Sequence, residues 1–122
     1  MRKTITCIIL LALAICSKSQ TIAEVRAEII RQGIPHPAVV LAQARLETGN
    51  FTSRVCKAKR NLFGIRAGKK YKSYARWQDS VADYKRRISS RYHGGDYYTF
   101  LRRIGYASDP RYAAKVRRIA GQ

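Results

Sequence analysis

The sequence predicts a mainly α-helical single domain of about five helices, with at most a very small β element. Three observations support this prediction. Apolar residues recur at helical spacing in several segments, and helix-starting and helix-ending residues flank those segments. A short strand or hairpin arm is expected at residues 71–75, a stretch with aromatic residues. At 122 residues the chain is long enough for one domain with a small core.

The first predicted helix covers residues 22–32. Thr21 and Glu24 have the spacing of a capping box, in which a hydroxyl and a carboxylate bind the N–H groups of the first turn. Apolar residues then recur at helical spacing as far as Ile30. Gly33 suits the end of this helix, because glycine readily adopts the left-handed conformation that follows a last turn.

The second predicted helix begins at Pro37, since proline fits the first turn, where its missing N–H is not needed. Residues 38–44 are apolar on nearly every side of such a helix. A helix of this composition is expected in the centre of a domain rather than on its surface. It is expected to end near Gly49, which can form a left-handed turn.

The middle of the chain carries weaker signals. Residues 50–75 are predicted to be irregular, apart from a short helix near residues 54–58 and the strand-like stretch named above. Ser80 and Asp83 have the spacing of a second capping box, and an apolar stripe at helical spacing follows to about residue 92. Asp83 is therefore interpreted as a capping residue.

Two further helices are predicted towards the C-terminal end. Asp96 is expected to cap a helix that ends at Gly105. Asp109 and Pro110 combine a capping carboxylate with a first-turn proline, which predicts that the last helix begins at Pro110. One face of this helix is expected to carry Tyr112, Ala113, Val116 and Ile119.

The chain is strongly basic, with 25 Lys and Arg against 7 Asp and Glu and a formal net charge of +18. Such a charge predicts attraction to a polyanion, and nucleic acid, anionic lipid and bacterial cell wall all qualify. Many of the basic residues are expected on the outward faces of the last three predicted helices. They are interpreted as a solvated face that also concentrates the protein on an anionic wall.

Residues 1–19 have the layout of a secretory signal peptide. Arg2 and Lys3 precede a run of apolar residues that is too short to span a membrane stably, and a polar stretch follows. Cleavage after Cys16 or after Ser19 both fit, and lipidation of Cys16 or a buried N-terminal helix are the alternatives. The prediction is an exported protein of the periplasm or cell envelope. Export argues against nucleic acid as the partner, because the polyanion outside the cytoplasm is the envelope.

Removal of residues 1–19 would leave Cys56 as a single cysteine, which cannot form an internal disulfide. Cys56 is interpreted as structural, since neither His36 nor His93 has a recognisable cysteine-protease context. The two histidines also lack the paired spacing of metal ligands, and no glycine-rich phosphate loop is present. The sequence therefore predicts neither a metal site nor a cofactor.

Glu47 differs from the other acids, most of which are interpreted as caps or surface residues. It closes the most apolar helix of the chain. A carboxyl group at the end of a buried helix is partly desolvated, which raises its pKa and suits it to donate a proton. On spacing alone, an ion pair of Glu47 with Arg45 or Arg54 is an equal alternative.

Four blocks of the chain resemble the bacterial glucosaminidase family, which includes autolysins, flagellum-associated wall hydrolases and mannosyl-glycoprotein endo-beta-N-acetylglucosaminidase-like domains. Residues 38–49, with the sequence LAQARLETG at 41–49, are similar to the family's catalytic helix. The other blocks are NLFGI at 61–65, the aromatic stretch and helix at 71–84, and YASDPRYAAKV at 106–116. They follow the family's order over about residues 21–120.

The resemblance implies a lysozyme-like catalytic domain over residues 20–122 that cleaves β-1,4 glycosidic bonds of peptidoglycan as an endo-β-N-acetylglucosaminidase. Glu47 matches the family's general acid, and Tyr106 matches a tyrosine beside that acid that orients water or the substrate's acetamido group. Positions expected to bind the sugar rings are Asn61, Phe63, Tyr74, Asp109 and Tyr112. Aromatic faces pack on sugar rings, although core packing is the alternative for each aromatic residue taken alone.

The chain departs from the family pattern at residues 66–70. Many members carry a second carboxylate in a longer insertion there, and this interval contains no acid. Three outcomes remain open. The N-acetyl group of the substrate acts as the nucleophile, which is the preferred interpretation, or Asp79 or Asp109 reaches the cleft, or the protein only binds the wall.

Several alternatives accompany this hypothesis. A muramidase or lytic transglycosylase on the same scaffold would cut the neighbouring linkage, a non-catalytic module would bind peptidoglycan without cutting it, and a basic nucleic-acid-binding protein is disfavoured by the signal peptide. The expected partners are peptidoglycan glycan strands and anionic envelope polymers. Wall remodelling and passage of an envelope-spanning secretion or transfer apparatus both fit as the process served.

Overall fold

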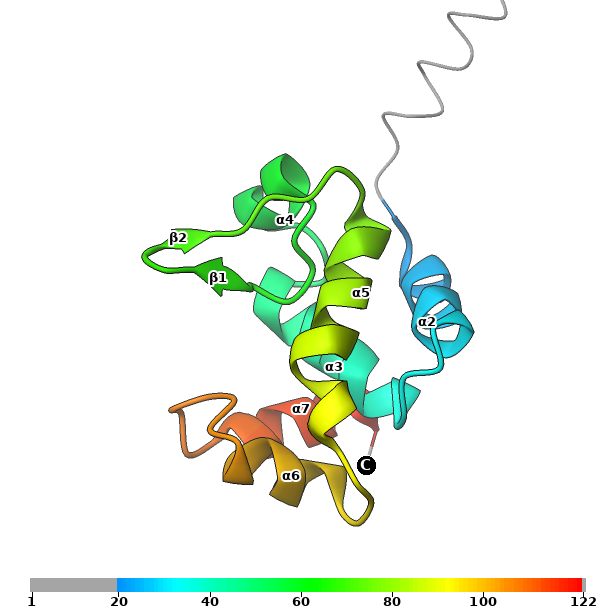
Figure 1. Ribbon diagram of the computed structural model, residues 1–122, viewed down its shortest axis with the longest axis vertical. Coiled ribbons are helices and arrows are strands. Elements are labelled where there is room, and N and C mark those ends of the chain that lie inside the picture. The colour runs from blue at the N-terminus through cyan, green and yellow to red at the C-terminus, as the bar shows by residue number, and fades with distance from the viewer. Residues whose placement is uncertain (1–19, 122) are drawn as a thin grey trace, which may run out of the picture.

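The computed structural model describes residues 20–121 of the chain. The predicted signal peptide and Cys16 lie outside the described residues. Figure 1 shows a helical domain with one small hairpin, which confirms the predicted fold class. Within residues 20–121, no helix combines the length and the apolar character needed to cross a membrane.

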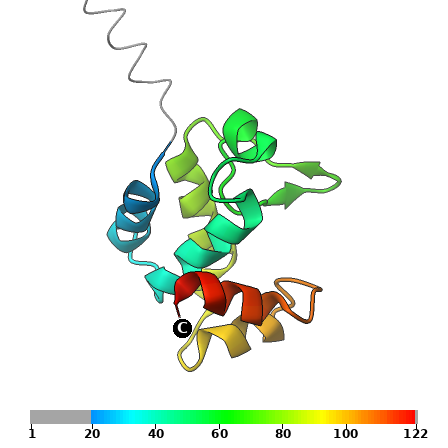
Figure 2. The same ribbon diagram turned by 180° about the vertical axis from the view of Figure 1, so that it is seen from behind.

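The elements follow one another along the chain without a large sheet. Their order is α2 (Ile22–Arg31), α3 (Pro37–Thr48), α4 (Arg54–Lys59), β1 (Arg66–Ala67), β2 (Lys70–Tyr71), α5 (Trp77–Arg87), the 3-10 turn η1 (Ser89–Arg91), α6 (Tyr97–Arg103) and α7 (Tyr112–Ala120). Helix α3 crosses the middle of the domain and packs against α2 and α7. Figure 2 shows the same arrangement from behind, with α7 below α3.

Helix α3 confirms the prediction of a buried central helix. Its six residues from Val39 to Ala44 are all buried, including the polar Gln43. Pro37 occupies its first turn, and His36 precedes it in the left-handed conformation. Gly49 ends the helix with a φ of 56°, and its N–H donates to the carbonyl of Arg45. This position needs the conformational freedom of glycine.

Local capping signals are correct at two helix starts. Thr21 and Glu24 form the predicted capping box of α2. Asp96 caps α6, where the Thr99 N–H donates to its carboxylate at 2.9 Å. The short helix predicted near 54–58 is α4, which Ser53 caps through the Cys56 N–H.

The predicted capping box at Ser80 and Asp83 is wrong. Helix α5 begins one turn earlier, at Trp77, and the carboxylate of Asp79 accepts the Arg76 N–H at 3.2 Å. Ser80 lies inside the helix, and its hydroxyl donates to the carbonyl of Trp77 at 2.6 Å. Asp83 lies in the interior of α5 and pairs with Lys72, Arg86 and Arg87 instead of capping the helix.

Two other boundaries also differ from the prediction. The hairpin pairs Arg66 with Tyr71 and Ala67 with Lys70, so the strands begin before the predicted 71–75 stretch. Its tight turn contains Gly68 with a φ of 65°, a turn signal that precedes the aromatic residues. Helix α7 begins at Tyr112, and Asp109 caps the turn before it by accepting the Arg111 N–H at 2.9 Å.

Candidate active site

Glu47 lies in the last turn of α3, where two hollows of the surface meet. The larger hollow has a volume of about 440 Å³ and the smaller about 250 Å³. Both are lined by Glu47, Gly64 and Arg66, so together they form a groove that passes over the Glu47 carboxyl group. Hollows of this size are typical of ligand sites.

The two sides of the groove come from different parts of the fold. The larger hollow is lined further by Phe63, Ile65, Tyr84, Arg87, Ile88, Arg91, Ile104, Gly105 and Tyr106. The smaller hollow is lined further by Thr48, Ser53, Val55, Asn61 and Tyr71. The groove therefore runs from the side of α4 and the hairpin to the side of α5, η1 and the segment after α6.

Gly64 keeps the junction of the two hollows open. Its φ is 65°, which L side chains rarely adopt. A Cβ atom at this position would lie 3.5 Å from Oε2 of Glu47 and 3.8 Å from the Tyr71 ring. Because glycine stands here, the backbone after Phe63 can pass close to the carboxyl group without a side chain between them.

The surroundings of Glu47 favour its protonated form. The residue reaches solvent through the groove, yet protein atoms around the carboxyl group limit its hydration, and this burial raises the pKa of Glu47. A hydrogen bond with the Tyr112 hydroxyl acts in the opposite direction but does not cancel the rise. A carboxyl group with a raised pKa can donate a proton closer to neutral pH.

The structure does not contain the alternative ion pair of Glu47. Within residues 20–121, no Lys, Arg or His nitrogen lies within 4.0 Å of its carboxylate. Arg45 instead donates from Nε to Oδ1 of Asn50 at 2.9 Å. The charged form of Glu47 therefore lacks the partner that would have lowered its pKa.

A neutral hydrogen-bond network supports the acid from behind. Gln43 lies one turn before Glu47 on α3 and is completely buried. Its Nε2 donates to the Tyr112 hydroxyl at 3.1 Å, and its Oε1 accepts from the Tyr84 hydroxyl at 2.6 Å. The Tyr84 hydroxyl also lies 2.8 Å from that of Tyr97. We call these four residues, Gln43, Tyr84, Tyr97 and Tyr112, the tyrosine network.

Gln43 and Tyr84 were not predicted from the sequence as part of the site. A signal was available for Gln43, because a lone amide inside a helix that is apolar all round must find buried hydrogen-bond partners. Nothing in the sequence indicated that these partners would be tyrosines from α5 and α7.

Tyr106 lies close to Glu47 and lines the groove, whereas Tyr112, expected to bind a sugar ring, adjoins Glu47 but lines neither hollow of the groove. Their ring centroids are 5.6 Å apart, and Tyr106 lines the larger hollow. Burial raises the pKa of both phenols well above the ordinary value, and the neighbouring Glu47 carboxylate adds to the rise. Both hydroxyls therefore stay protonated and can donate hydrogen bonds.

Asn61 and Phe63 are buried parts of the groove wall. The Asn61 amide donates to the carbonyls of Ile65 and Lys72 at 2.8 and 2.9 Å and accepts the N–H groups of Ile65 and Phe63 at 3.0 and 3.3 Å. These four bonds use its whole capacity and leave none for a sugar. Asn61 thus holds the loop in place, while Phe63 stacks on Tyr84 with centroids 4.4 Å apart.

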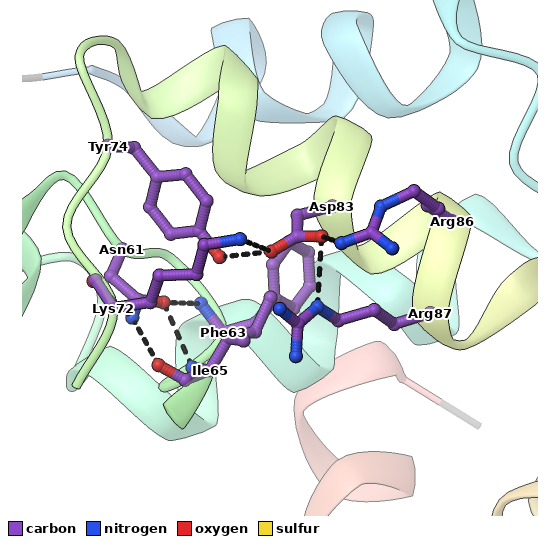
Figure 3. Close-up of polar contacts among 8 residues, drawn as sticks. All are labelled: Asn61, Phe63, Ile65, Lys72, Tyr74, Asp83, Arg86 and Arg87. Carbon is purple, nitrogen blue, oxygen red and sulfur yellow. Dashed lines mark hydrogen bonds and ion pairs between the residues drawn. The ribbon is translucent and has the colours of Figure 1, made fainter. Parts of the chain in front are cut away.

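Tyr74 does not line either hollow of the groove. Its hydroxyl donates to Oδ2 of Asp83 at 2.7 Å, and Figure 3 shows the Tyr74 side chain directed towards the Asp83 carboxylate. Asp83 also accepts from Lys72 at 2.9 Å, Arg86 at 2.6 Å and Arg87 at 3.0 Å. We call Asp83 and these four partners the Asp83 cluster.

Asp83 has the opposite electrostatic environment to Glu47. Burial alone would raise its pKa, but the hydrogen bonds from Tyr74, Lys72, Arg87 and Arg86 outweigh burial and hold the pKa well below its usual range. Asp83 therefore remains ionised and is unsuited to proton donation.

The two aspartates considered as a second carboxylate lie elsewhere. Asp79 caps α5 and pairs with Arg76. Asp109 lines a separate, smaller hollow beside Tyr106 and Tyr112 and pairs with Lys115 at 2.7 Å, which lowers its pKa. In the described part of the chain, Glu47 is the one acid that lines the two groove hollows. No group of three or more possible metal-ligating side chains gathers among residues 20–121.

Comparisons with known proteins identify the family of the chain. A family model described as mannosyl-glycoprotein endo-beta-N-acetylglucosaminidase matches residues 22–122. The chain is 33% identical over 120 residues to the peptidoglycan hydrolase FlgJ of Vibrio parahaemolyticus, a match that covers 68% of this chain and 39% of that protein. It is 32% identical over 122 residues to FlgJ of Vibrio cholerae, which covers 70% and 36%.

The chain spans less than two fifths of the length of these two relatives. No solved structure gives a significant match. The family match nevertheless includes nearly every described residue, from the first turn of α2 through the groove to α7. The chain belongs to the glucosaminidase family of glycoside hydrolases.

Proposed function

We propose that the protein is a peptidoglycan hydrolase that cuts the β-1,4 bonds of the glycan strand as an endo-β-N-acetylglucosaminidase, with Glu47 as general acid. The observation that carries this proposal is the setting of Glu47: a carboxyl group with a raised pKa, at the junction of two hollows, that forms no ion pair with any cation among residues 20–121. The relatives named peptidoglycan hydrolase indicate the polymer on which such a group would act.

In the proposed reaction, Glu47 gives its proton to the glycosidic oxygen as the bond from that oxygen to the sugar C1 breaks. Since Glu47 is the one acid lining the groove among residues 20–121, the nucleophile is assigned to the substrate. The carbonyl oxygen of the 2-acetamido group forms a bond to C1 from the opposite face. The resulting cyclic intermediate is opened by water, which returns a proton to Glu47 and restores the acetamido group.

Tyr106 and Tyr112 have supporting roles in this proposal. The Tyr112 hydroxyl interacts with the Glu47 carboxyl group and is itself held by Gln43, so it orients the acid. Tyr106 lines the larger hollow with a protonated hydroxyl, which can donate a hydrogen bond to the acetamido group or to the attacking water.

Digestion of purified cell walls tests both the activity and the bond. A glucosaminidase leaves N-acetylglucosamine at the new reducing ends, a muramidase leaves N-acetylmuramic acid, and a lytic transglycosylase leaves anhydro-muramic products. Mass spectrometry of the fragments separates the three. We expect reducing-end N-acetylglucosamine from the unmodified protein and almost no fragments from Glu47→Gln. Equal digestion by both proteins would exclude the acid role of Glu47.

The second candidate function is a wall-binding module without activity, favoured by the single carboxylate of the groove. Pull-down of the unmodified protein with insoluble wall, without release of any fragment, would support it. For either function we propose a location in the periplasm or envelope, where the strong positive charge holds the protein on anionic polymers. Cell fractionation and the N-terminal mass of the recovered protein test that location and the cleavage of residues 1–19.

A further inference from the structure

The wall of the larger hollow carries more positive charge than a neutral glycan needs. Arg66, Arg87 and Arg91 line this hollow, and Glu47 is the one acid among its lining residues. The three arginines come from separate elements, β1, α5 and η1. A substrate that fills the hollow therefore meets guanidinium groups on more than one side.

Arg87 is fixed in place from the side that faces away from the groove. Its Nε donates to Oδ1 of Asp83 at 3.0 Å, and the Asp83 side chain is only 6% exposed. Figure 3 shows the terminal nitrogens of Arg87 pointing away from that carboxylate. Because the contact uses only the Nε edge, the terminal N–H groups remain for another acceptor.

Asp83 does not neutralise its surroundings. Its one negative charge meets three cations, those of Lys72, Arg86 and Arg87, and Tyr74 takes a further share of its hydrogen-bonding capacity. The Asp83 cluster thus has an excess of positive charge beside the groove. This excess is built on a buried carboxylate rather than on freely moving surface chains.

Arg66 is also oriented before any ligand arrives. Its guanidinium group stacks on the Tyr71 ring, 4.1 Å from the centroid, and its Nη1 donates to the Lys69 carbonyl at 3.2 Å. Arginine held in this way presents a planar fork of donors that matches a carboxylate. Arg91 stands exposed on η1 at the same hollow and completes the wall.

We propose that Arg66, Arg87 and Arg91 form a carboxylate-binding subsite, which selects glycan whose sugars carry an acidic substituent next to the bond at Glu47. This inference rests on the proposed function and adds a specificity to it. The carboxylate comes either from the lactyl group of a muramic acid that has lost its stem peptide or from the stem peptide itself. With this subsite, the protein recognises the negative charge of the glycan as well as its sugars.

Binding measurements on a non-hydrolysing form test the subsite separately from catalysis. Isothermal titration of Glu47→Gln uses four soluble ligands: peptide-free glycan fragments with free lactyl carboxylates, the same fragments with those groups amidated, fragments with stem peptides, and neutral N-acetylglucosamine oligomers. We expect the ligands with free carboxylates to bind about 10-fold more tightly than the amidated and neutral ones, as charge-assisted bonds allow.

Substitutions assign the effect to the arginines. In the Glu47→Gln background, Arg87→Gln and Arg91→Gln should each weaken binding of the carboxylate ligands by about 3- to 10-fold and leave the amidated ligand unchanged. Arg118→Gln on the exposed face of α7 removes the same charge away from the groove and should leave the affinity for all four ligands nearly unchanged. Arg91→Gln keeps the test valid if loss of the Asp83 contact impairs folding of Arg87→Gln.

The ligands also distinguish the two sources of the carboxylate. Tight binding of the peptide-free fragments points to the lactyl group, whereas tight binding only of the peptide-bearing fragments points to the stem peptide. Equal affinity for free and amidated ligands in the Glu47→Gln form would overturn the inference. Failure of the proposed function has a different signature, namely no cleavage of any glycan by the unmodified protein, and the binding results do not depend on it.

Discussion

Glu47 and Asp83 are two carboxylates of one small domain whose pKa values shift in opposite directions. Among residues 20–121, no cationic nitrogen lies within 4.0 Å of the Glu47 carboxylate, and burial raises the pKa of Glu47. Asp83 is less exposed than Glu47, yet its cationic and phenolic partners lower its pKa. Burial alone therefore does not make a general acid. The decisive difference is whether cationic groups contact the carboxylate directly.

The largest expected effect comes from removing the acid. Glu47→Gln should lower kcat on soluble glycan by about 10²- to 10⁴-fold, the usual contribution of general acid catalysis. Glu28→Gln is a matched control, because Glu28 pairs with Arg31 on α2 and lies outside the groove. Initial rates of fragment release measure both variants. A rate for Glu47→Gln within a factor of two of the unmodified protein would contradict the distinction between the two carboxylates.

Asp83→Asn should instead reduce stability. Loss of the carboxylate leaves Lys72, Arg86 and Arg87 without their shared partner, and we expect the free energy of unfolding to fall by about 2 kcal/mol. Asp79→Asn, whose ion pair with Arg76 is partly exposed, should cost less than about 1 kcal/mol. Urea denaturation at pH 7 measures both changes.

The pH dependence of stability tests whether the ionised Asp83 carboxylate stabilises the fold. Because the folded-state pKa of Asp83 is lowered, its stabilisation is present above the unfolded pKa of about 4 and is lost as the pH falls towards the lower folded value. The difference between the unmodified protein and Asp83→Asn should therefore shrink in acid. A difference that stays constant from pH 7 to pH 2 would show that the carboxylate charge is not what stabilises the Asp83 cluster.

Gln43→Met tests whether the tyrosine network tunes the acid. The change keeps the volume but removes both hydrogen bonds of a buried amide, so the free energy of unfolding should fall by about 1–2 kcal/mol. Tyr112 would also hold the Glu47 carboxylate less well, and the pKa of Glu47 should rise. The alkaline limb of the pH–rate profile would then move to higher pH. The partly exposed Gln78→Met on α5 should move neither stability nor the profile.

Gly64→Ala separates backbone strain from obstruction of the groove. The positive φ should cost about 1 kcal/mol of stability, and Gly33→Ala, with a φ of 72°, should cost the same. Only the methyl group at position 64 would stand 3.5 Å from Glu47, since nothing lies within 4 Å of a Cβ at Gly33. Activity should therefore fall in Gly64→Ala alone, as paired melting curves and rates can show.

The smallest expected effect is on the stability of Glu47→Gln. A raised folded-state pKa means that ionisation of Glu47 opposes folding as the pH rises through that value. Removing the charge should stabilise the protein at neutral pH, by less than about 0.5 kcal/mol after allowance for the groove's access to water. Loss of stability in this variant would mean that the Glu47 charge has a partner in solution.

Local signals in the sequence were enough to predict several features. The buried central helix followed from residues 38–44, and the starts of α2 and α6 followed from Thr21 and Asp96. The position of Glu47 at the tip of α3 was predictable in the same way. Each of these features depends on residues within one or two helical turns of one another.

Features that depend on contacts between distant residues were not predictable. Ser80 and Asp83 match a capping box as well as Thr21 and Glu24 do, but α5 begins at Trp77 and Asp83 binds Lys72 and Tyr74 from outside the helix. Asparagine and tyrosine serve equally for binding sugars and for holding a loop, so the sequence could not separate these roles for Asn61 and Tyr74. The arginine wall of the groove joins three elements, and no spacing along the chain revealed it.

Cys56 provides a built-in reporter of unfolding. Cys56 lies on the buried side of α4 and is 3% exposed, its Sγ lies 3.5 Å from the Gln20 amide nitrogen, and burial raises the pKa of the thiol. A thiol that is both covered and protonated reacts slowly with alkylating reagents. The labelling rate of this sulfur therefore measures how often the junction of α4 with the rest of the domain opens.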